Sequence, residues 1–206
     1  AFQETDMMGI TMPITKHSFQ LRNPNDAAST IIKAYKLANT GRPGPIYIDL
    51  PKDIQNMEVT EPIPEDVEMP TYRPTINPNP LQLKKAAELI IKAERPVILA
   101  GGGVNISFAH KELLKFAESL WIPVATTTMG KGCFPEDHPL SLGVTGMHGT
   151  EHANWAMINT DLLIAVGSRF SDRVTGEIKS FEQGKKIIHI DIDPSEIGKN
   201  VRVHIP

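Results

Sequence analysis

Pro96–Gly103 reads PVILAGGG and Leu162–Gly167 reads LLIAVG, and these two stretches decide the fold. Each is a short apolar run that stops at glycine, which is typical of a buried strand followed by a tight turn. Similar apolar runs occupy 122–126 and 187–191. Strands that are apolar throughout are buried on both faces, so the pattern predicts a doubly wound parallel sheet in an α/β fold.

Helical periodicity separates these expected strands. One helix is expected from Pro80, a second from Ser107 and a third over 151–159, whereas 201–206 has the character of a further strand. The residues expected on the inner face of the first helix are Leu83, Ala86, Ala87 and Ile90.

The part of the chain before the sheet has a different character. Turn residues at 23–26 precede a helix expected over 26–39, in which Ala28, Ile31, Tyr35 and Ala38 recur at helical spacing, and a strand is expected over 45–50. Proline and acidic residues then alternate from 51 to 80. Because proline removes a backbone donor and fixes φ, this stretch predicts an extended, solvated linker without helix, and therefore a domain boundary.

Composition excludes several classes of protein. The 206 residues are 40% hydrophobic and carry a net charge of −3, which fits a globular protein and gives no support to a nucleic-acid or anionic-membrane partner. A single cysteine, Cys133, excludes a disulfide framework and fits a reducing compartment. No apolar run approaches the roughly 18 residues of a membrane helix. Both ends run directly into patterned sequence, so we expect a piece of a longer chain.

Three expected strands end in residues that suit a ligand. The triplet Gly101–Gly103 would let backbone amides approach an anion, or would merely turn the chain. The stretch Gly167–Arg173 offers arginines for phosphate, or forms a solvated loop with an ion pair. An acid in Asp191–Asp193 would accept from ribose hydroxyls, or would cap a helix. The first is not a G-x-G-x-x-G motif, because Ile106 replaces the last glycine. All three lie at one edge of a parallel sheet, which favours a dinucleotide.

Other residues invite alternative interpretations. The stretch 148–152 matches the zinc-peptidase pattern H-x-x-E-H, but Gly149 disfavours a helix there, so we expect no zinc site. Cys133, near His138, is expected to be structural rather than nucleophilic, and Lys131 is expected to be solvated. Trp121 and Trp155 are expected in the core.

Motifs spread over the whole chain carry a family resemblance. They are AFQET (1–5), ITKH (14–17), GRPGP (41–45), DLPKD (49–53), GGG (101–103), GMHGT (146–150), GSRFSDR (167–173) and HIDID (189–193). In this order they resemble the catalytic large subunit of acetolactate synthase, also called acetohydroxyacid synthase, a thiamine-diphosphate enzyme. Met12 departs from the family, which usually has arginine there.

The resemblance implies a domain organisation. Residues 1–55 would be the C-terminal part of the thiamine-pyrimidine-binding domain, 56–78 a proline-rich acidic linker, and 79–206 a truncated, Rossmann-like central domain that holds FAD. Gln3 would face thiamine or substrate, and Lys52 would lie near the substrate channel. The implied FAD contacts are Arg42, Gly101, Gly102, Gly103, Thr127, Thr128, Met129, Met147, His148, Gly149, Gly167, Ser168, Arg169, Asp172, Arg173, Val174, Asp191 and Ile192.

The resemblance also implies an activity for the parent subunit. It would condense two pyruvates to 2-acetolactate with loss of CO2, in branched-chain amino-acid biosynthesis, and would also accept 2-oxobutanoate. Thiamine diphosphate and Mg²⁺ would be held by other regions, since this sequence lacks the Gly-Asp-Gly motif that binds them, and the fragment alone would be inactive. A homodimer or tetramer with a small regulatory subunit is expected, in the cytoplasm or in an organelle of a eukaryote. The alternatives are glyoxylate carboligase, pyruvate oxidase or a non-catalytic nucleotide-binding module.

Overall fold

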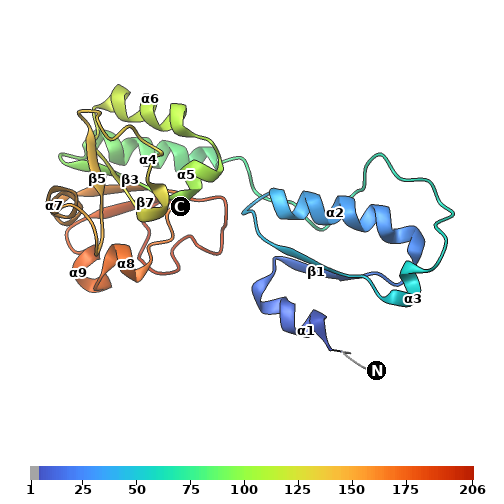
Figure 1. Cartoon of the computed structure of the whole chain (residues 1–206). Helices are drawn as coiled ribbons and strands as arrows, with labels where there is room; N and C mark the ends of the chain where they lie inside the picture. Colours follow the sequence, from blue (N-terminus) through green and yellow to red (C-terminus); the bar gives the residue numbers. More distant parts are fainter. Residues whose placement is uncertain (1–4) are drawn as a thin grey trace. The chain divides into compact units, whose positions relative to one another are not determined.

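The computed structural model describes residues 5–206 (Figure 1). The contacts of the chain divide it into two compact units, of which the first extends to Ile76 and the second runs from Asn77 to Pro206. Among the described residues, no helix combines the length and the apolar character that crossing a membrane requires.

The first unit is built around a strand–helix–strand crossover. Its elements are α1 (Met7–Thr11), η1 (Met12–Ile14), β1 (His17–Gln20), η2 (Pro24–Asp26), α2 (Ala27–Asn39), β2 (Ile46–Asp49) and α3 (Lys52–Gln55). The two strands pair in parallel, with His17 opposite Ile46 and Gln20 opposite Asp49. The expected helix and the expected second strand are confirmed, whereas β1 was not anticipated because its sequence, HSFQ, is largely polar.

The apolar side chains expected on one face of α2 are not all buried. Ala34 is buried, but Ile31 and Tyr35 are 58% and 73% exposed. The reason is the small size of the sheet: a pair of strands contacts only a narrow strip of a helix, and α2 places a small residue there. In the described residues Ile31 and Tyr35 therefore form an apolar surface on the outer side of α2.

The segment after β2 is extended but not free. Pro51 precedes the short helix α3, so the expectation of no helix after this proline is wrong at its first turn. Further on, the Thr60 amide donates to Asn25 Oδ1 over 2.8 Å, Lys36 pairs with Asp66, and Tyr72 bonds to the carbonyl of Thr40. The expected solvated linker therefore contacts the first unit at several places.

The second unit is a five-stranded parallel sheet in the order β5-β4-β3-β6-β7. Its elements are α4 (Pro80–Lys92), β3 (Pro96–Ala100), α5 (Gly102–Ile106), α6 (His110–Leu120), β4 (Val124–Thr126), η3 (Thr128–Gly130), β5 (Ser141–Val144), α7 (Glu151–Asn159), β6 (Leu162–Val166), α8 (Asp172–Thr175), α9 (Ile178–Glu182) and β7 (Lys186–Ile190). The doubly wound α/β fold is confirmed.

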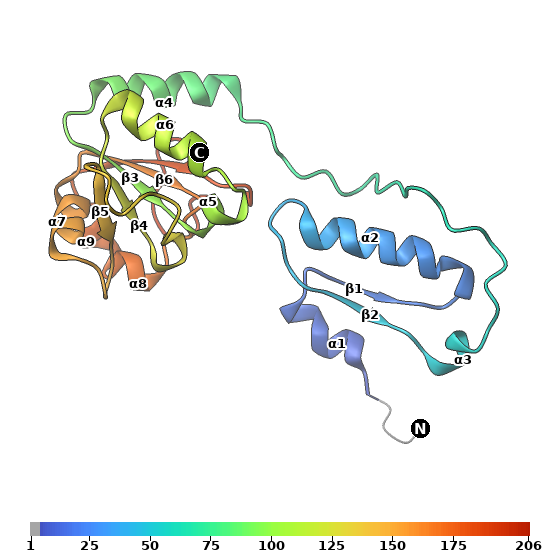
Figure 2. The same ribbon diagram turned by 45° about the horizontal axis from the view of Figure 1, so that its top comes forward.

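Both faces of this sheet are covered, as Figure 2 shows with α4 and α6 on one side and α7 and α9 on the other. On the first face, Ile98 and Ile164 pack with Leu113 of α6, and Ile90 of α4 lies against them. On the second face, a separate cluster contains Leu99 and Leu163 of the sheet, together with Met157 of α7 and Phe181 of α9. Successive residues of one strand thus supply two cores, which is why the strands are apolar throughout.

Several sequence expectations about this unit are wrong. Ser107 follows α5 rather than starting a helix, and 201–206 forms only a bridge between Ile205 and Ile188. Leu83 is 54% exposed and Ala87 is also exposed, so only Ala86 and Ile90 of the expected face pack inward.

The expectation that the two tryptophans lie in the core is also wrong. Trp121 is 69% exposed and Trp155 is 65% exposed, so neither belongs to the core. Trp121 adopts a left-handed backbone conformation (φ 53°) at the end of α6, where the chain turns at the surface. Trp155 lies between the buried residues Ala153 and Met157 of α7 and points away from the side that they pack.

Candidate functional site

All the strands of the second unit are parallel, so their carboxyl ends share one edge. From β3 the chain proceeds to β4 and β5 on one side, and then to β6 and β7 on the other. The strand order therefore reverses between β3 and β6, and ligands of open α/β sheets bind at such a reversal. The loops after these two strands contain Gly101–Gly103 and Gly167–Arg173, and the loop after β7 begins with Asp191.

Gly101 and Gly103 are required because the two loops touch. A Cβ on Gly101 would lie 2.2 Å from the carbonyl oxygen of Gly167, and one on Gly103 would lie 2.6 Å from the Gly167 Cα. The Gly101 amide donates to Val166 over 2.8 Å, and the Gly103 amide donates to the Gly167 carbonyl over 3.0 Å. These two amides are bonded within the protein, which favours the role of turning the chain for both glycines, and their contact with a cofactor stays a prediction.

Gly102 differs from its neighbours. It is the first residue of α5, and the first amides of a helix have no acceptor within the helix. A Cβ at this position would lie 3.1 Å from the Cβ of Met129, which follows β4 and is 74% exposed. Gly102 is therefore the glycine of the triplet whose amide suits an anion.

The residues before Met129 have unequal roles. The Thr127 amide donates to the Ala100 carbonyl over 2.9 Å, and its side chain accepts from the Gly130 amide over 3.0 Å. Thr127 is buried and joins β4 to β3, whereas Thr128 is exposed beside Met129.

The loop after β6 presents its cations to solvent. Arg169 and Arg173 are exposed, while Ser168 and Phe170 are buried. Arg173 Nε lies 4.0 Å from Asp172 Oδ2, with both side chains more than 70% exposed. Such a surface pair contributes about 0–1 kcal/mol, so it does not hold the guanidinium away from a ligand. Val174 completes the turn by donating its amide to Ser171.

The loop after β5 also contacts Arg173. The Met147 amide donates to the Arg173 carbonyl over 2.9 Å, and Arg173 Nη1 contacts the Met147 sulfur at 3.7 Å. Since β5 and β6 are not neighbours in the sheet, this loop crosses the edge to meet α8. A Cβ on Gly149 would lie 2.6 Å from the Val144 carbonyl oxygen, so this glycine also serves a close backbone approach.

The H-x-x-E-H residues do not share a helix. Thr150 caps the amino end of α7 by accepting from the Ala153 amide, so His148 precedes the helix and His152 lies within it. Within residues 5–206, no cluster of three or more His, Cys, Asp or Glu side chains is arranged to hold a metal ion.

The acids after β7 turn the chain. Asp191 Oδ1 accepts from the Asp193 amide over 2.9 Å, and Asp193 in turn accepts from the amide of Ser195. The capping interpretation therefore describes these contacts, although the residues that follow form turns rather than a helix. The other oxygen of Asp191 lies 3.9 Å from Nε2 of His189. Ile192 is 39% exposed next to it.

His189 is a residue that the sequence argument missed. Its ring is fully buried, and its Nε2 lies 2.8 Å from the Ser168 carbonyl oxygen. Burial lowers the pKa of His189 below its usual value, which favours the neutral ring. The available signal was a histidine within an otherwise apolar strand.

Cys133 and Lys131 lie outside this arrangement. Burial raises the pKa of the Cys133 thiol to about 11, which disfavours the thiolate that a nucleophile requires. Lys131 is 63% exposed at its side chain and pairs with Glu136 over 3.2 Å. The neighbour of the thiol in sequence, His138, pairs instead with Glu118 over 3.4 Å.

The remaining expected residues belong to the first unit. Arg42 is exposed after Gly41, whose φ is 60°, and Lys52 is the exposed first residue of α3. Their roles stay predictions, and Gln3 lies outside the described residues.

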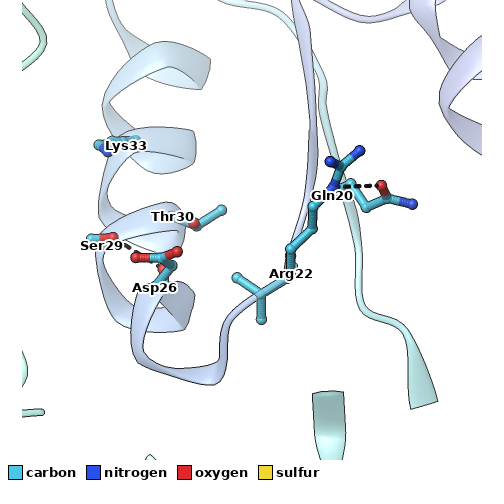
Figure 3. Close-up of a pocket in the computed structure, with 7 residues that line it drawn as sticks. Gln20, Arg22, Asp26, Ser29, Thr30 and Lys33 are labelled. Atoms are coloured by element: carbon cyan, nitrogen blue, oxygen red, sulfur yellow. Dashed lines mark hydrogen bonds between the residues drawn. The ribbon is translucent and has the colours of Figure 1, made fainter. Parts of the chain in front are cut away.

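An open pocket of about 310 Å³ was not anticipated in the first unit (Figure 3). It lies between β1 and the start of α2 and is lined by Gln20, Leu21, Arg22, Asp26, Ser29, Thr30 and Lys33. Arg22 Nε donates to Gln20 Oε1 over 3.2 Å along the strand, while Lys33 lines the pocket from α2 (Figure 3).

The fold and the loops at its edge define a doubly wound domain of the kind found in thiamine pyrophosphate enzymes. Residues 83–206 match the family described as thiamine pyrophosphate enzyme, central domain, and the chain belongs to that family.

The match to individual proteins is more specific than the family match. Over its whole length the chain is 61% identical to a probable acetolactate synthase large subunit of Methanocaldococcus jannaschii, covering 35% of that protein. It is 52% identical to the acetolactate synthase large subunit of Corynebacterium glutamicum and 44% identical to that of Haemophilus influenzae, covering 33% and 36% of them. The chain thus spans about a third of the length of the curated relatives that it matches.

Proposed function

We propose that this chain is part of an acetolactate synthase large subunit, and that its second unit holds FAD at the carboxyl edge of the sheet. The observation that carries the FAD proposal is the juxtaposition at the β3–β6 reversal. There the Gly102 amide and the exposed Arg169 and Arg173 follow adjacent strands. Identity to large subunits over the whole chain supports the parent assignment.

The donor set at the edge fits the chemistry of FAD. A pyrophosphate needs cations and amide donors, which Arg169, Arg173 and Gly102 provide. Asp191 offers carboxylate oxygens to ribose hydroxyls. The exposed apolar side chains of Met129 and Met147 suit the planar rings of the cofactor.

Each residue then has a distinct task. The arginines neutralise the charge of the pyrophosphate, and the missing Cβ of Gly102 lets the backbone approach it. Asp191 orients the ribose, and Gly101, Gly103 and Gly167 hold the two loops in register. When bound, FAD supplies a redox-active ring, although the carboligation proposed for the parent involves no net redox change.

The proposed parent reaction joins two pyruvates into 2-acetolactate and releases CO2, with 2-oxobutanoate as a second acceptor. Thiamine diphosphate and Mg²⁺ would be held by segments outside this chain, because its sequence contains no Gly-Asp-Gly. We place the parent in a homodimer or tetramer that associates with a small regulatory subunit.

The FAD site is tested by titrating FAD into the full-length subunit and following the quenching of flavin fluorescence. Arg173→Ala should raise the Kd about ten- to a hundredfold, as expected for one lost charge-assisted bond. The matched control is Arg95→Ala, since Arg95 is also exposed but precedes β3 at the opposite edge. Equal Kd values for the unaltered subunit and folded Arg173→Ala would place the site elsewhere.

A further inference from the structure

The loop Gly167–Arg173 is held by bonds to successive backbone carbonyls. The Ser168 carbonyl oxygen accepts from Nε2 of His189 over 2.8 Å. The carbonyl oxygens of Arg169 and Phe170 accept from Asn200 Nδ2 over 2.9 and 3.2 Å. Phe170 has a φ of 51°, which is unusual for a bulky residue and has to be maintained by its surroundings. The side chains that fix this loop therefore come from β7 and from the segment after it.

The tautomer of His189 follows from this geometry. A carbonyl oxygen can only accept, so Nε2 carries the hydrogen that it donates to Ser168. The other ring nitrogen, Nδ1, is buried and has no hydrogen-bond partner among residues 5–206. The ring also meets Phe170 edge-on, with centroids 5.0 Å apart.

An unpartnered nitrogen in the core is costly, and an apolar side chain would avoid that cost. The remaining interactions of His189 are therefore the ones that offset it. The side chain bonds to Ser168, contacts Phe170 and lies 3.9 Å from Asp191 Oδ2, and the first two of these interactions act on the same loop.

We propose that His189 is a positioning residue for the nucleotide site. Its Nε2–H fixes the Ser168 carbonyl and thereby sets the backbone from which Arg169 and Arg173 extend. This inference rests on the proposed FAD site, but the conformation of the loop can be tested without the cofactor.

The test compares His189→Asn with His189→Gln in the full-length subunit. The terminal amide of glutamine reaches about as far as Nε2 and keeps a donor for Ser168, whereas that of asparagine falls short. His138→Asn is the control, because His138 is half-buried before β5 and lies away from this loop. The measurements are the Kd for FAD and, without FAD, the rate at which trypsin cuts after Arg169 and Arg173.

We expect His189→Asn to raise the Kd for FAD about tenfold, the factor that one lost hydrogen bond gives, and to accelerate cleavage after both arginines. His189→Gln should restore both to within about twofold of the unaltered subunit.

Other outcomes overturn the inference in distinguishable ways. Unchanged Kd and cleavage in His189→Asn would show that the loop does not depend on His189. Equal losses in folded Asn and Gln variants would assign the effect to packing rather than to the donor. If the unaltered subunit binds no FAD, the proposed function fails, and the cleavage rates alone decide whether His189 positions the loop.

Discussion

Lys16 and Tyr72 meet at the carboxyl end of α2, where the Lys16 ammonium donates to the Tyr72 hydroxyl over 2.9 Å. The same ammonium donates to the Leu37 carbonyl over 2.6 Å, and the Tyr72 hydroxyl donates to the Thr40 carbonyl over 2.9 Å. The last carbonyls of a helix need such partners, and a cation there is also favoured by the helix dipole. Tyr72 thereby fastens the segment before the second unit next to Gly41.

Tyr72→Phe should lower the free energy of unfolding of the first unit by about 1 kcal/mol, because the ring stays over Lys16 but the hydroxyl bonds are lost. Chemical denaturation of the variant and of the unaltered protein measures the free energy of unfolding. The same change at Tyr35, which is 73% exposed on α2, serves as the control and should have an effect below about 0.5 kcal/mol. Indistinguishable effects at the two tyrosines would show that the segment is not fastened by this contact.

Gly101→Ala and Gly102→Ala should behave differently. At Gly101 the new Cβ would meet backbone at 2.2 Å, so we expect a loss of about 3 kcal/mol of stability. At Gly102 the nearest atom is the Met129 Cβ at 3.1 Å, so a movement of a few tenths of an ångström relieves the contact, and the loss should stay within about 1 kcal/mol. Denaturation of both variants measures the difference, and equal losses would contradict the close approach of the β3 and β6 loops.

Lys185 should make stability depend on alkaline pH. It is 6% exposed, bonds to the Met157 carbonyl over 2.5 Å, and burial lowers its pKa from 10.5 to about 8. The folded state thus binds fewer protons than the unfolded state between these values, so the contribution of Lys185 to stability rises with pH from about 8 to 10.5. Below pH 8 the buried charge costs up to about 3 kcal/mol.

Lys185→Met should therefore have a larger free energy of unfolding than the unaltered protein at pH 7, and this difference should be smaller at pH 10. Denaturation at both pH values measures it, and taking the difference between the two proteins removes contributions from Cys133, whose pKa is also shifted by burial. A difference in the free energy of unfolding that stays constant with pH would show that Lys185 does not titrate in this range.

The predicted contact of Arg42 with FAD is tested by Arg42→Ala, which should raise the Kd of the full-length subunit for FAD about ten- to a hundredfold, as expected for one lost charge-assisted bond. The control is Arg22→Ala, since Arg22 is an exposed arginine of the same unit at the opposite end of α2. Equal affinities in both variants would remove Arg42 from the predicted FAD contacts.

The isolated chain should form no acetolactate from pyruvate, even with FAD, thiamine diphosphate and Mg²⁺ added, because it lacks the Gly-Asp-Gly motif. A colorimetric assay of the product measures this, with the full-length subunit as the positive control. Product above a blank without protein would refute the expectation.

The apolar strands β3 and β6 were predictable from sequence, whereas the partly polar strands β1 and β5 were not. β3 and β6 lie inside the sheet and are apolar throughout, so their pattern is unambiguous. β5 lies at an edge, reads SLGV, and pairs with β4 across an irregularity at Val124 and Ala125. Its polar and glycine residues removed the apolar signal on which the prediction depended.

For the candidate site, the sequence indicated which loops share one edge of the sheet but not which contacts each residue makes there. The parallel pattern places Gly101–Gly103, Gly167–Arg173 and Asp191 together. That two of the glycines touch a neighbouring loop, and that His189 bonds across to Ser168, are contacts between segments distant in sequence. Residue spacing along one segment carries no information about such contacts.

The burial of Cys133 makes the chain a convenient host for spectroscopic labels. Its thiol is the chain's single cysteine, is 2% exposed and has a pKa of about 11, so thiol reagents at neutral pH should leave it unmodified. A cysteine introduced at Arg73 and another at Glu94, both exposed, would then take up a donor and an acceptor dye without removal of the native thiol. Energy transfer between the dyes would report the distance between the two labelled positions with and without FAD.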